Sequence, residues 1–170
     1  PAANILIADE KNFNSDKRET FLVKMATNDY DAVIITHSAF GLINVSPETY
    51  EEFVTQRIDE LVEFIREKKA EEGKKAKVAQ LENSIANLRD KIKAKYDESL
   101  KNKTLTFEEL GVDMLFVDEA QQFKNLMFQT GMQGVAGLGN PAGSDRSLDM
   151  AIKLDRLQIR IKFVHQRHPR

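Results

Sequence analysis

Two adjacent carboxylates, Asp118 and Glu119, stand directly after the apolar run Met114–Val117. Four consecutive apolar residues suit a β-strand that is buried on both faces, as the strands of parallel sheets are. The carboxylates would then lie at the C-terminal end of the strand, where open α/β sheets bind their ligands. There, one carboxylate can hold a divalent metal through water, while the other positions or deprotonates an attacking water molecule. Without its surroundings, the same pair also fits the ordinary start of a loop.

Two earlier apolar runs, Asn4–Ala8 and Asp31–Thr36, predict strands that would belong to the same sheet. Between them, Ser15 or Asp16 can cap a helix, because a short side-chain oxygen accepts from the first free amides. A strand, a helix and a strand at this spacing form a βαβ unit, for which we expect a right-handed crossover. Polar residues follow the second run, so they would lie at the C-terminal end of its strand.

The pattern changes over residues 47–103, where two heptad seams predict paired helices. Ser46-Pro47-Glu48 has the residues of a helix start: a capping serine, a proline and an acid in the first turn. The seams consist of Val54, Ile58, Leu61 and Ile65, and then of Val78, Leu81, Ile85, Leu88 and Ile92. The polar stretch around Gly73 predicts an antiparallel helical hairpin, although a single helix through Gly73 would lose only about 1 kcal/mol. The hairpin is either a solvated structural arm or an arm that contacts a partner or DNA.

The chain then returns to short elements before the two carboxylates. Thr106 and Glu109 form a capping box for one short helical turn that ends at Gly111. Val112–Val117 is the third predicted strand. Together with the first two strands, it predicts a parallel sheet that the hairpin interrupts.

The last part of the chain begins with a stretch that has no periodic pattern. Residues 131–143 hold five of the chain's eight glycines, so we expect a mobile loop there. Ser144 or Asp145 then caps a last helix. The tail over residues 153–170 carries six Lys and Arg against one acid, which fits a solvated helix or phosphate contacts.

Length and composition bound the possibilities. The 170 residues are enough for one domain with a core, and the net charge of −2 does not by itself announce a nucleic-acid protein. There is no cysteine, hence no disulfide framework and no thiolate zinc site. No apolar run approaches the length of about 20 residues that spans a bilayer. The chain begins with Pro1 rather than Met, which we interpret as a piece cut from a longer cytoplasmic protein.

The segment Leu115–Asn125, Leu-Phe-Val-Asp-Glu-Ala-Gln-Gln-Phe-Lys-Asn, resembles motif II of superfamily 2 helicases and translocases, also called the Walker B or DEAD/DEAH box. Its Lys124-Asn125 pair looks most like the SNF2-like branch, in which an Asp-Glu-Ala-His box precedes a hydrophobic residue and Lys-Asn. Gln121 stands where that branch usually carries His, and other helicase groups use Gln there.

The resemblance implies a role for each residue of the box. Asp118 would bind Mg²⁺ through water, and Glu119 would activate the attacking water. Gln121 would act with this catalytic pair by coupling the site to nucleic acid. Lys124 and Asn125 would brace the box or reach the nucleic-acid backbone.

Asp31–Phe40 resembles the earlier strand of the same lobe, which ends in polar residues near the DNA path. Thr36, His37 and Ser38 would therefore face nucleic acid. More broadly, the chain resembles the helicase portion of large phage- and plasmid-borne proteins that join an SNF2-like helicase to a DNA methylase. This implies an α/β fold, a partial RecA-like parallel sheet with helices. Residues 1–46 and 104–170 would form the lobe, and 47–103 would be an inserted antiparallel hairpin.

The parts of a helicase motor that the sequence lacks matter equally. No P-loop G-x-x-x-x-G-K-[ST] is present to hold nucleotide phosphates, and motif III and a second lobe are missing too. We therefore expect a fragment whose parent uses Mg²⁺ and ATP, while this chain alone binds neither and is inactive. The expected partners are DNA, the remaining helicase lobes and a methylase domain. Bare sheet edges or the hairpin would also favour self-association.

Two other interpretations stay open. The chain could be a non-enzymatic coiled-coil interaction or structural module, with Asp118-Glu119 as the start of a loop. A metal-dependent nuclease or phosphatase is disfavoured, because Asp9-Glu10 is the only other acidic pair at a predicted strand end. The sequence does not distinguish DNA from RNA, or unwinding from translocation.

Overall fold

The computed structural model describes residues 2–68, 75–101, 104–123, 126 and 144–166. The chain divides into two compact units. The first unit contains Pro1–Ser46, Lys103–Asp118 and Asp149–Arg170, and the second contains Pro47–Asn102 and Glu119–Leu148. The three-part division expected from the sequence stays a prediction.

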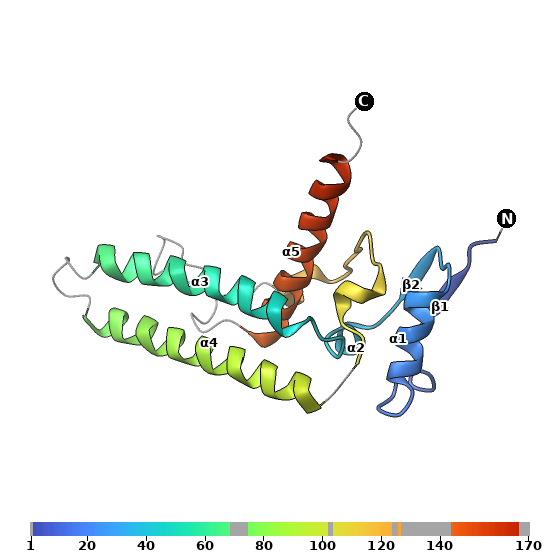
Figure 1. Cartoon of the computed structure of the whole chain (residues 1–170), viewed down its shortest axis with the longest axis horizontal. Coiled ribbons are helices and arrows are strands. Elements are labelled where there is room, and N and C mark those ends of the chain that lie inside the picture. The colour runs from blue at the N-terminus through green and yellow to red at the C-terminus, as the bar shows by residue number, and fades with distance from the viewer. Residues whose placement is uncertain (1, 69–74, 102–103, 124–125, 127–143, 167–170) are drawn as a thin grey trace. The chain divides into compact units, whose positions relative to one another are not determined.

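A short parallel sheet and one helix form the N-terminal part of the first unit. Strand β1 (Ile5–Ile7) pairs with β2 (Ala32–Ile34), and α1 (Arg18–Thr27) connects them, as Figure 1 shows. Ile5 lies opposite Ala32, and Ile7 lies opposite Ile34. The predicted βαβ unit is therefore confirmed, although both strands are shorter than the apolar runs that predicted them.

The third strand predicted over Val112–Val117 is wrong. The structure describes this segment as neither strand nor helix, and the side chains of Met114 and Phe116 are 67% and 88% exposed. A strand needs the backbone of a neighbour to pair its N–H and C=O groups. Among the described residues this segment has no strand partner, so the apolar pattern alone does not produce a strand.

The first unit also contains two short helical turns, and an aromatic residue of each turn is buried. After β2 comes the single turn α2 (His37–Phe40), and the 3₁₀ turn η1 (Phe107–Leu110) lies further along the chain. The rings of Phe40 and Phe107 meet edge to face, with centroids 5.8 Å apart. The buried apolar residues of this unit are Ala8, Phe13, Phe21, Leu22, Phe40, Ile43, Val45, Phe107, Leu110, Met150, Ile152 and Leu157.

The capping box before η1 is confirmed. The backbone N–H and the hydroxyl of Thr106 donate to the Glu109 carboxylate at 2.7 and 3.0 Å. The turn ends at Gly111, whose φ of 73° lies in the left-handed region that glycine adopts without steric cost.

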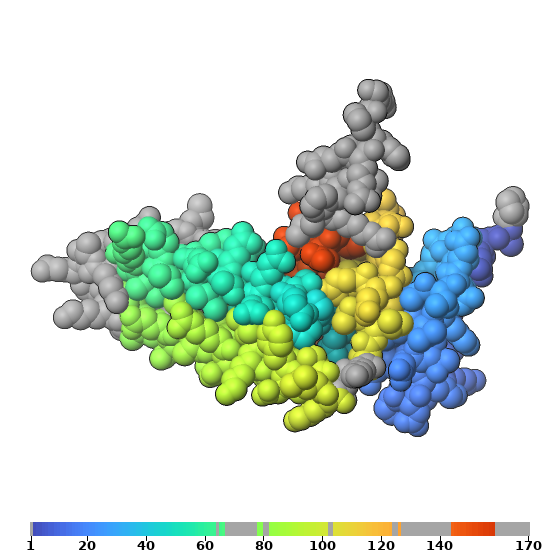
Figure 2. All heavy atoms as spheres, viewed as in Figure 1, coloured from blue at the N-terminus to red at the C-terminus, as the bar shows by residue number. Residues whose placement is uncertain are grey.

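The second unit is dominated by two long helices, α3 (Pro47–Lys68) and α4 (Lys75–Lys101), which run side by side in opposite directions (Figure 1). Figure 2 shows their side chains in contact. Both predicted helices are present, and α3 begins at the predicted proline. The buried seam residues are Tyr50, Phe53, Val54, Ile58, Leu61 and Ile65 of α3 with Ile85 and Leu88 of α4. Gly73 lies outside the described residues.

A polar contact joins the N-terminal part of α3 to the C-terminal part of α4. The Tyr96 hydroxyl donates to the Glu51 carboxylate at 2.6 Å. That hydrogen bond, with smaller contributions from desolvation and from the charges of Glu51 and Glu48, raises the pKa of Tyr96 to about 12. The start of α3 is thereby joined to the end of α4.

The last helix, α5 (Asp145–Gln166), crosses the division between the units. The backbone N–H of Ser147 donates to Ser144 Oγ at 3.2 Å, so the predicted serine cap is confirmed. The glycine-rich stretch over residues 131–143 lies outside the described residues. No described helix is long and apolar enough to cross a membrane. The whole is a mixed α/β structure that is mostly helical, and a RecA-like sheet stays a prediction.

Candidate functional site

The two predicted catalytic carboxylates lie in an exposed turn. Asp118 and Glu119 are both exposed, and the 3₁₀ turn η2 (Ala120–Phe123) follows them directly. Glu119 has a φ of 52°, and no other non-glycine residue in the described part of the chain has a positive φ. A left-handed conformation costs about 1–2 kcal/mol for a residue with a Cβ. The chain therefore holds the predicted base in an unfavourable backbone conformation.

The carboxylate of Glu119 has a polar partner within the same turn. The side-chain amide of Gln121 donates to Glu119 Oε2, and the backbone N–H of Gln122 donates to the Glu119 carbonyl at 3.0 Å. The structure thus brings together two of the residues that the sequence predicted for chemistry. Their contact connects the candidate base to the residue expected to sense nucleic acid.

A metal at this turn would depend on Asp118. In the part of the chain that the structure describes, no group of three or more His, Cys, Asp or Glu side chains could hold a metal ion. A water-mediated Mg²⁺ site needs only one or two carboxylates plus substrate phosphates. The exposed carboxylate of Asp118 fits such a site, whereas Asp9-Glu10 joins no larger acidic cluster among the described residues.

The second candidate segment follows β2 in the first unit. Thr36 Oγ1 accepts from the Ala39 backbone N–H at 3.2 Å and lies 3.3 Å from Ser38 Oγ. Thr36 and Ser38 are exposed, and His37 is half-buried. Hydroxyl groups and an imidazole at the C-terminal end of a strand can donate hydrogen bonds to phosphate or sugar oxygens. The geometry is therefore compatible with the predicted nucleic-acid contacts.

Several long-range contacts anchor the end of this segment. The Lys153 ammonium group donates to the Phe40 carbonyl at 2.9 Å and to Asp149 Oδ2 at 2.7 Å. The Phe107 backbone N–H donates to the Asn44 carbonyl at 2.8 Å. The backbone between β2 and α3 is thus fastened to both η1 and α5.

A family model described as a probable helicase domain matches residues 1–163 of the chain. The chain belongs to this helicase-domain family. No curated protein and no solved structure matches the chain. The helicase resemblance found in the sequence is therefore confirmed at the level of the family. Its assignment to superfamily 2, to the SNF2-like branch and to motif II stays a prediction.

Two predicted residues of the helicase-domain chain, Lys124 and Asn125, lie outside the described residues. Of the others, Glu119 contacts Gln121, and Thr36 contacts Ser38. These two pairs belong to different units.

Sequence reasoning on the helicase-domain chain missed two residues. Arg146 Nη1 donates to Gln122 Oε1 at 3.1 Å, next to the predicted motif, and nothing in the sequence pattern indicates this contact. The sequence places Lys153 in a basic tail that is either solvated or in contact with phosphates, and both interpretations are wrong for this residue because its side chain is fully buried. The signal that could have found it is Asp149, four residues earlier on a helix whose Met150, Ile152 and Leu157 are apolar.

Proposed function

We propose that the chain is the part of an ATP-dependent DNA helicase or translocase motor that carries motif II. The observation that carries this proposal is the Asp118-Glu119-Ala-Gln turn of a helicase-family chain, in which Glu119 has the left-handed backbone. Residues held in sparsely populated conformations cluster at functional sites, where the strain orients a side chain. Superfamily 2 and the SNF2-like branch are the finer assignment that we favour.

Each residue of the turn has a proposed task. Bound Mg²⁺ would neutralise the charge that develops on the nucleotide phosphates. Asp118 would hold this ion through a water ligand. Glu119 accepts a proton from the attacking water, and Gln121 holds the Glu119 carboxylate and couples it to nucleic acid. Lys124 and Asn125 support the turn or contact the nucleic-acid backbone.

The nucleotide phosphates would be held by another part of the motor. The sequence contains no P-loop, so we propose that this chain alone neither binds ATP tightly nor hydrolyses it. Its partners would be DNA at Thr36, His37 and Ser38, the remaining helicase lobes and a methylase domain. The location would be the cytoplasm of a bacterium, or of a host that expresses a phage gene.

Self-association is also proposed, because the sheet of the first unit has exposed residues. Ile5, Ile7 and Ile34 are each about half exposed, although parallel sheets are normally covered on both faces. A second chain could add a strand to the outer backbone edges of this sheet, which has two strands among the described residues, and a second chain that packs against its face would cover these side chains. Light scattering at high concentration tests this, and a strictly monomeric chain would contradict it.

The decisive experiment measures DNA-stimulated ATP hydrolysis in a protein that contains this chain with complete helicase lobes. Glu119→Gln should lower the rate by about 10²–10⁴-fold, because a positioned general base contributes that much. Glu52→Gln, an exposed acid on α3, is the matched control and should leave the rate unchanged. An unchanged rate in Glu119→Gln would remove the catalytic assignment. Rapid Mg²⁺-dependent hydrolysis by the 170-residue chain alone would overturn the proposal that it is inactive.

A second candidate function rests on the two long helices. The α3–α4 seam is a continuous apolar interface of the kind that coiled-coil modules use. Under this alternative the chain is a non-enzymatic interaction module. The reading frame around the gene distinguishes the two, because an upstream P-loop and a downstream second lobe support the motor.

A further inference from the structure

In the described part of the chain, the ionisable side chain of Lys153 is fully buried. The proposed function does not explain this burial. The exposed fraction of Lys153 is 0%, and its ammonium group lies 4.3 Å from the centroid of the Phe40 ring and 6.0 Å from that of Phe107. Burying an ammonium group is costly unless hydrogen bonds and an opposite charge compensate for it. The Phe40 carbonyl, the Asp149 carboxylate and the faces of the rings supply that compensation.

The atoms that Lys153 contacts belong to the end of one short element. Phe40 is the last residue of α2, and its carbonyl also accepts from the Ile43 backbone N–H at 3.1 Å. At the other end of this single turn, Thr36 Oγ1 accepts from the Ala39 N–H. A four-residue turn has too few hydrogen bonds of its own to be stable, so external contacts decide its position.

Stability alone does not call for a lysine at this position. Replacing both members of a buried ion pair by uncharged residues of similar volume is often neutral or stabilising, whereas removing one member leaves the other charge unpaired. Lys153→Met combined with Asp149→Asn would fill the space between Phe40 and Phe107 and leave no unpaired charge. What methionine cannot supply is a donor to the Phe40 carbonyl, and hence a link between α5 and the end of α2.

We propose that Lys153 is a positioning residue, which holds α2 so that Thr36, His37 and Ser38 present one fixed arrangement to nucleic acid. The inference deepens the proposed function and rests on it for the identity of the ligand. Lys153 itself is buried and touches no nucleic acid. It acts through the Phe40 carbonyl, from α5 to the segment after β2.

The test compares Lys153→Met with the unmodified chain in three measurements. These are the melting temperature, hydrogen exchange of the Gly41 and Ile43 amides, and the anisotropy of a fluorescein-labelled single-stranded DNA oligonucleotide. Lys153→Met is made throughout in combination with Asp149→Asn, so that no carboxylate is left without its partner. Exchange at Gly41 and Ile43 should accelerate on the order of tenfold, because a hydrogen bond to a charged group is lost. DNA affinity should fall by a similar factor without a lower melting temperature. The amides of α3 serve as the internal reference.

Two variants separate positioning from other effects. Lys153→Arg keeps a cationic donor and should recover most of the DNA affinity, which a purely apolar filling role would not require. Lys93→Met removes an exposed positive charge from α4 and should leave the exchange at Gly41 unchanged. If Lys153→Met does not fold, Phe40→Leu takes its place, because it removes the ring that faces the ammonium group. It should change exchange and affinity in the same direction, and wild-type values in it would overturn the proposal.

The outcomes distinguish this inference from the proposed function. If the unmodified chain binds DNA and Lys153→Met binds equally well with unchanged exchange, the positioning role fails and the proposed function stands. If the unmodified chain binds no DNA, the nucleic-acid role of Thr36, His37 and Ser38 fails and the inference fails with it. Weaker binding together with faster exchange and an unchanged melting temperature supports both.

Discussion

Two segments of the chain were predicted from the same pattern, an apolar run that ends in polar residues, yet the structure treats them differently. The segment after β2 is held by a paired strand, by buried aromatic rings and by the fully buried Lys153. The segment over residues 112–123 has no strand, and its Met114 and Phe116 are exposed. Two of its side-chain contacts join exposed polar groups, Glu119 with Gln121 and Gln122 with Arg146.

The difference shows what makes a strand. Both runs have the side chains of a buried strand, but only β2 has a neighbouring strand that pairs with its backbone. Without a neighbouring strand among the described residues, the segment over residues 112–123 leaves Met114 and Phe116 exposed, while Leu115 and Val117 are half-buried. The proposed nucleic-acid segment is therefore built into the first unit, whereas the proposed motif II segment retains a strained residue and an exposed carboxylate pair.

The largest effect is expected from a matched pair of phenylalanines. Phe40→Ala should lower the free energy of unfolding by about 3–5 kcal/mol, because it empties a buried aromatic site. Phe116→Ala should change it by less than about 0.5 kcal/mol, because its side chain is 88% exposed. Urea unfolding followed by circular dichroism measures both. A large loss in Phe116→Ala would mean that residues 112–117 do form a covered strand in solution.

The sequence was most informative where a local rule acts. The heptad seams predicted α3 and α4, the Thr106–Glu109 capping box predicted η1, and Ser144 predicted the start of α5. Each rule depends on residues that are three or four positions apart on the same element. Such contacts depend little on tertiary structure, but the rule is not sufficient. The cap predicted at Ser15 or Asp16 is wrong, because α1 begins at Arg18 and Lys17 precedes it without a side-chain cap hydrogen bond.

The sequence was least informative where distant residues decide. The pairing of Val112–Val117 depends on a neighbour that periodicity does not reveal. The burial of Lys153 depends on Phe40 and Phe107, which are far away along the chain. For the site, the helicase family was predictable and motif II stays a prediction, but the left-handed backbone of Glu119 was not predictable. Backbone strain is a property of the folded turn and not of residue spacing.

A second matched pair tests the strain at the motif. Glu119→Gly should raise the free energy of unfolding by about 1 kcal/mol, because glycine adopts a φ of 52° without steric cost. Gly111→Ala should lower the free energy of unfolding by about 1 kcal/mol, because a φ of 73° is strained for alanine. Nothing lies within 4 Å of the added Cβ, so no steric clash adds to this loss. Thermal unfolding measures both changes. If Glu119→Gly is destabilising instead, the turn is not strained in solution, and the argument from its backbone is lost.

High pH should break the hydrogen bond between Tyr96 and Glu51, because it deprotonates the Tyr96 hydroxyl. The pKa of Tyr96 is raised from 10 to about 12, so its neutral form is favoured in the folded protein. This contribution to stability is complete below pH 10 and is lost as the pH rises through about 12. The melting temperature of the unmodified chain should therefore fall more steeply between these values than that of Tyr96→Phe. Parallel curves for the two proteins would show that this contact does not stabilise the α3–α4 pair.

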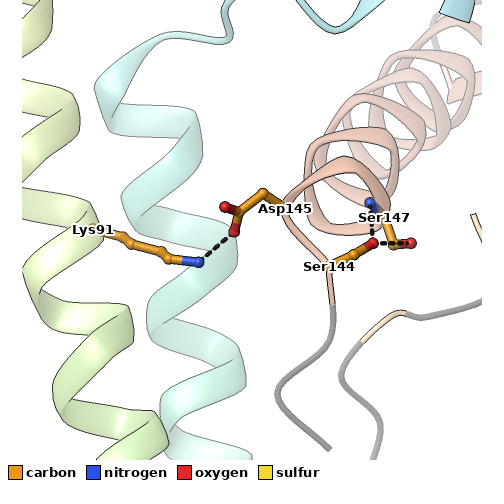
Figure 3. Close-up of polar contacts among 4 residues, drawn as sticks. All are labelled: Lys91, Ser144, Asp145 and Ser147. Atoms are coloured by element: carbon orange, nitrogen blue, oxygen red, sulfur yellow. Dashed lines mark hydrogen bonds and ion pairs between the residues drawn. The ribbon is translucent and has the colours of Figure 1, made fainter. Parts of the chain in front are cut away.

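The smallest effect is expected for the exposed ion pair between Lys91 and Asp145 of the second unit. Lys91 Nζ of α4 donates to Asp145 Oδ1 in the first turn of α5, next to the Ser144 cap and Ser147 (Figure 3). The Asp145 side chain is largely exposed, so a double-mutant cycle with Lys91→Ala and Asp145→Ala should give a coupling of about 0.2–1 kcal/mol. The cycle is needed because Asp145 also interacts favourably with the N-terminus of its helix.

High salt should weaken the exposed ion pair Lys91–Asp145 more than the buried ion pair Lys153–Asp149. The coupling between Lys91 and Asp145 should decrease in 1 M NaCl, where the Debye length falls to about 3 Å. The coupling between Lys153 and Asp149, measured by the same cycle with alanine, should change much less, because Lys153 is fully buried. Equal salt dependence would mean that water reaches both pairs alike.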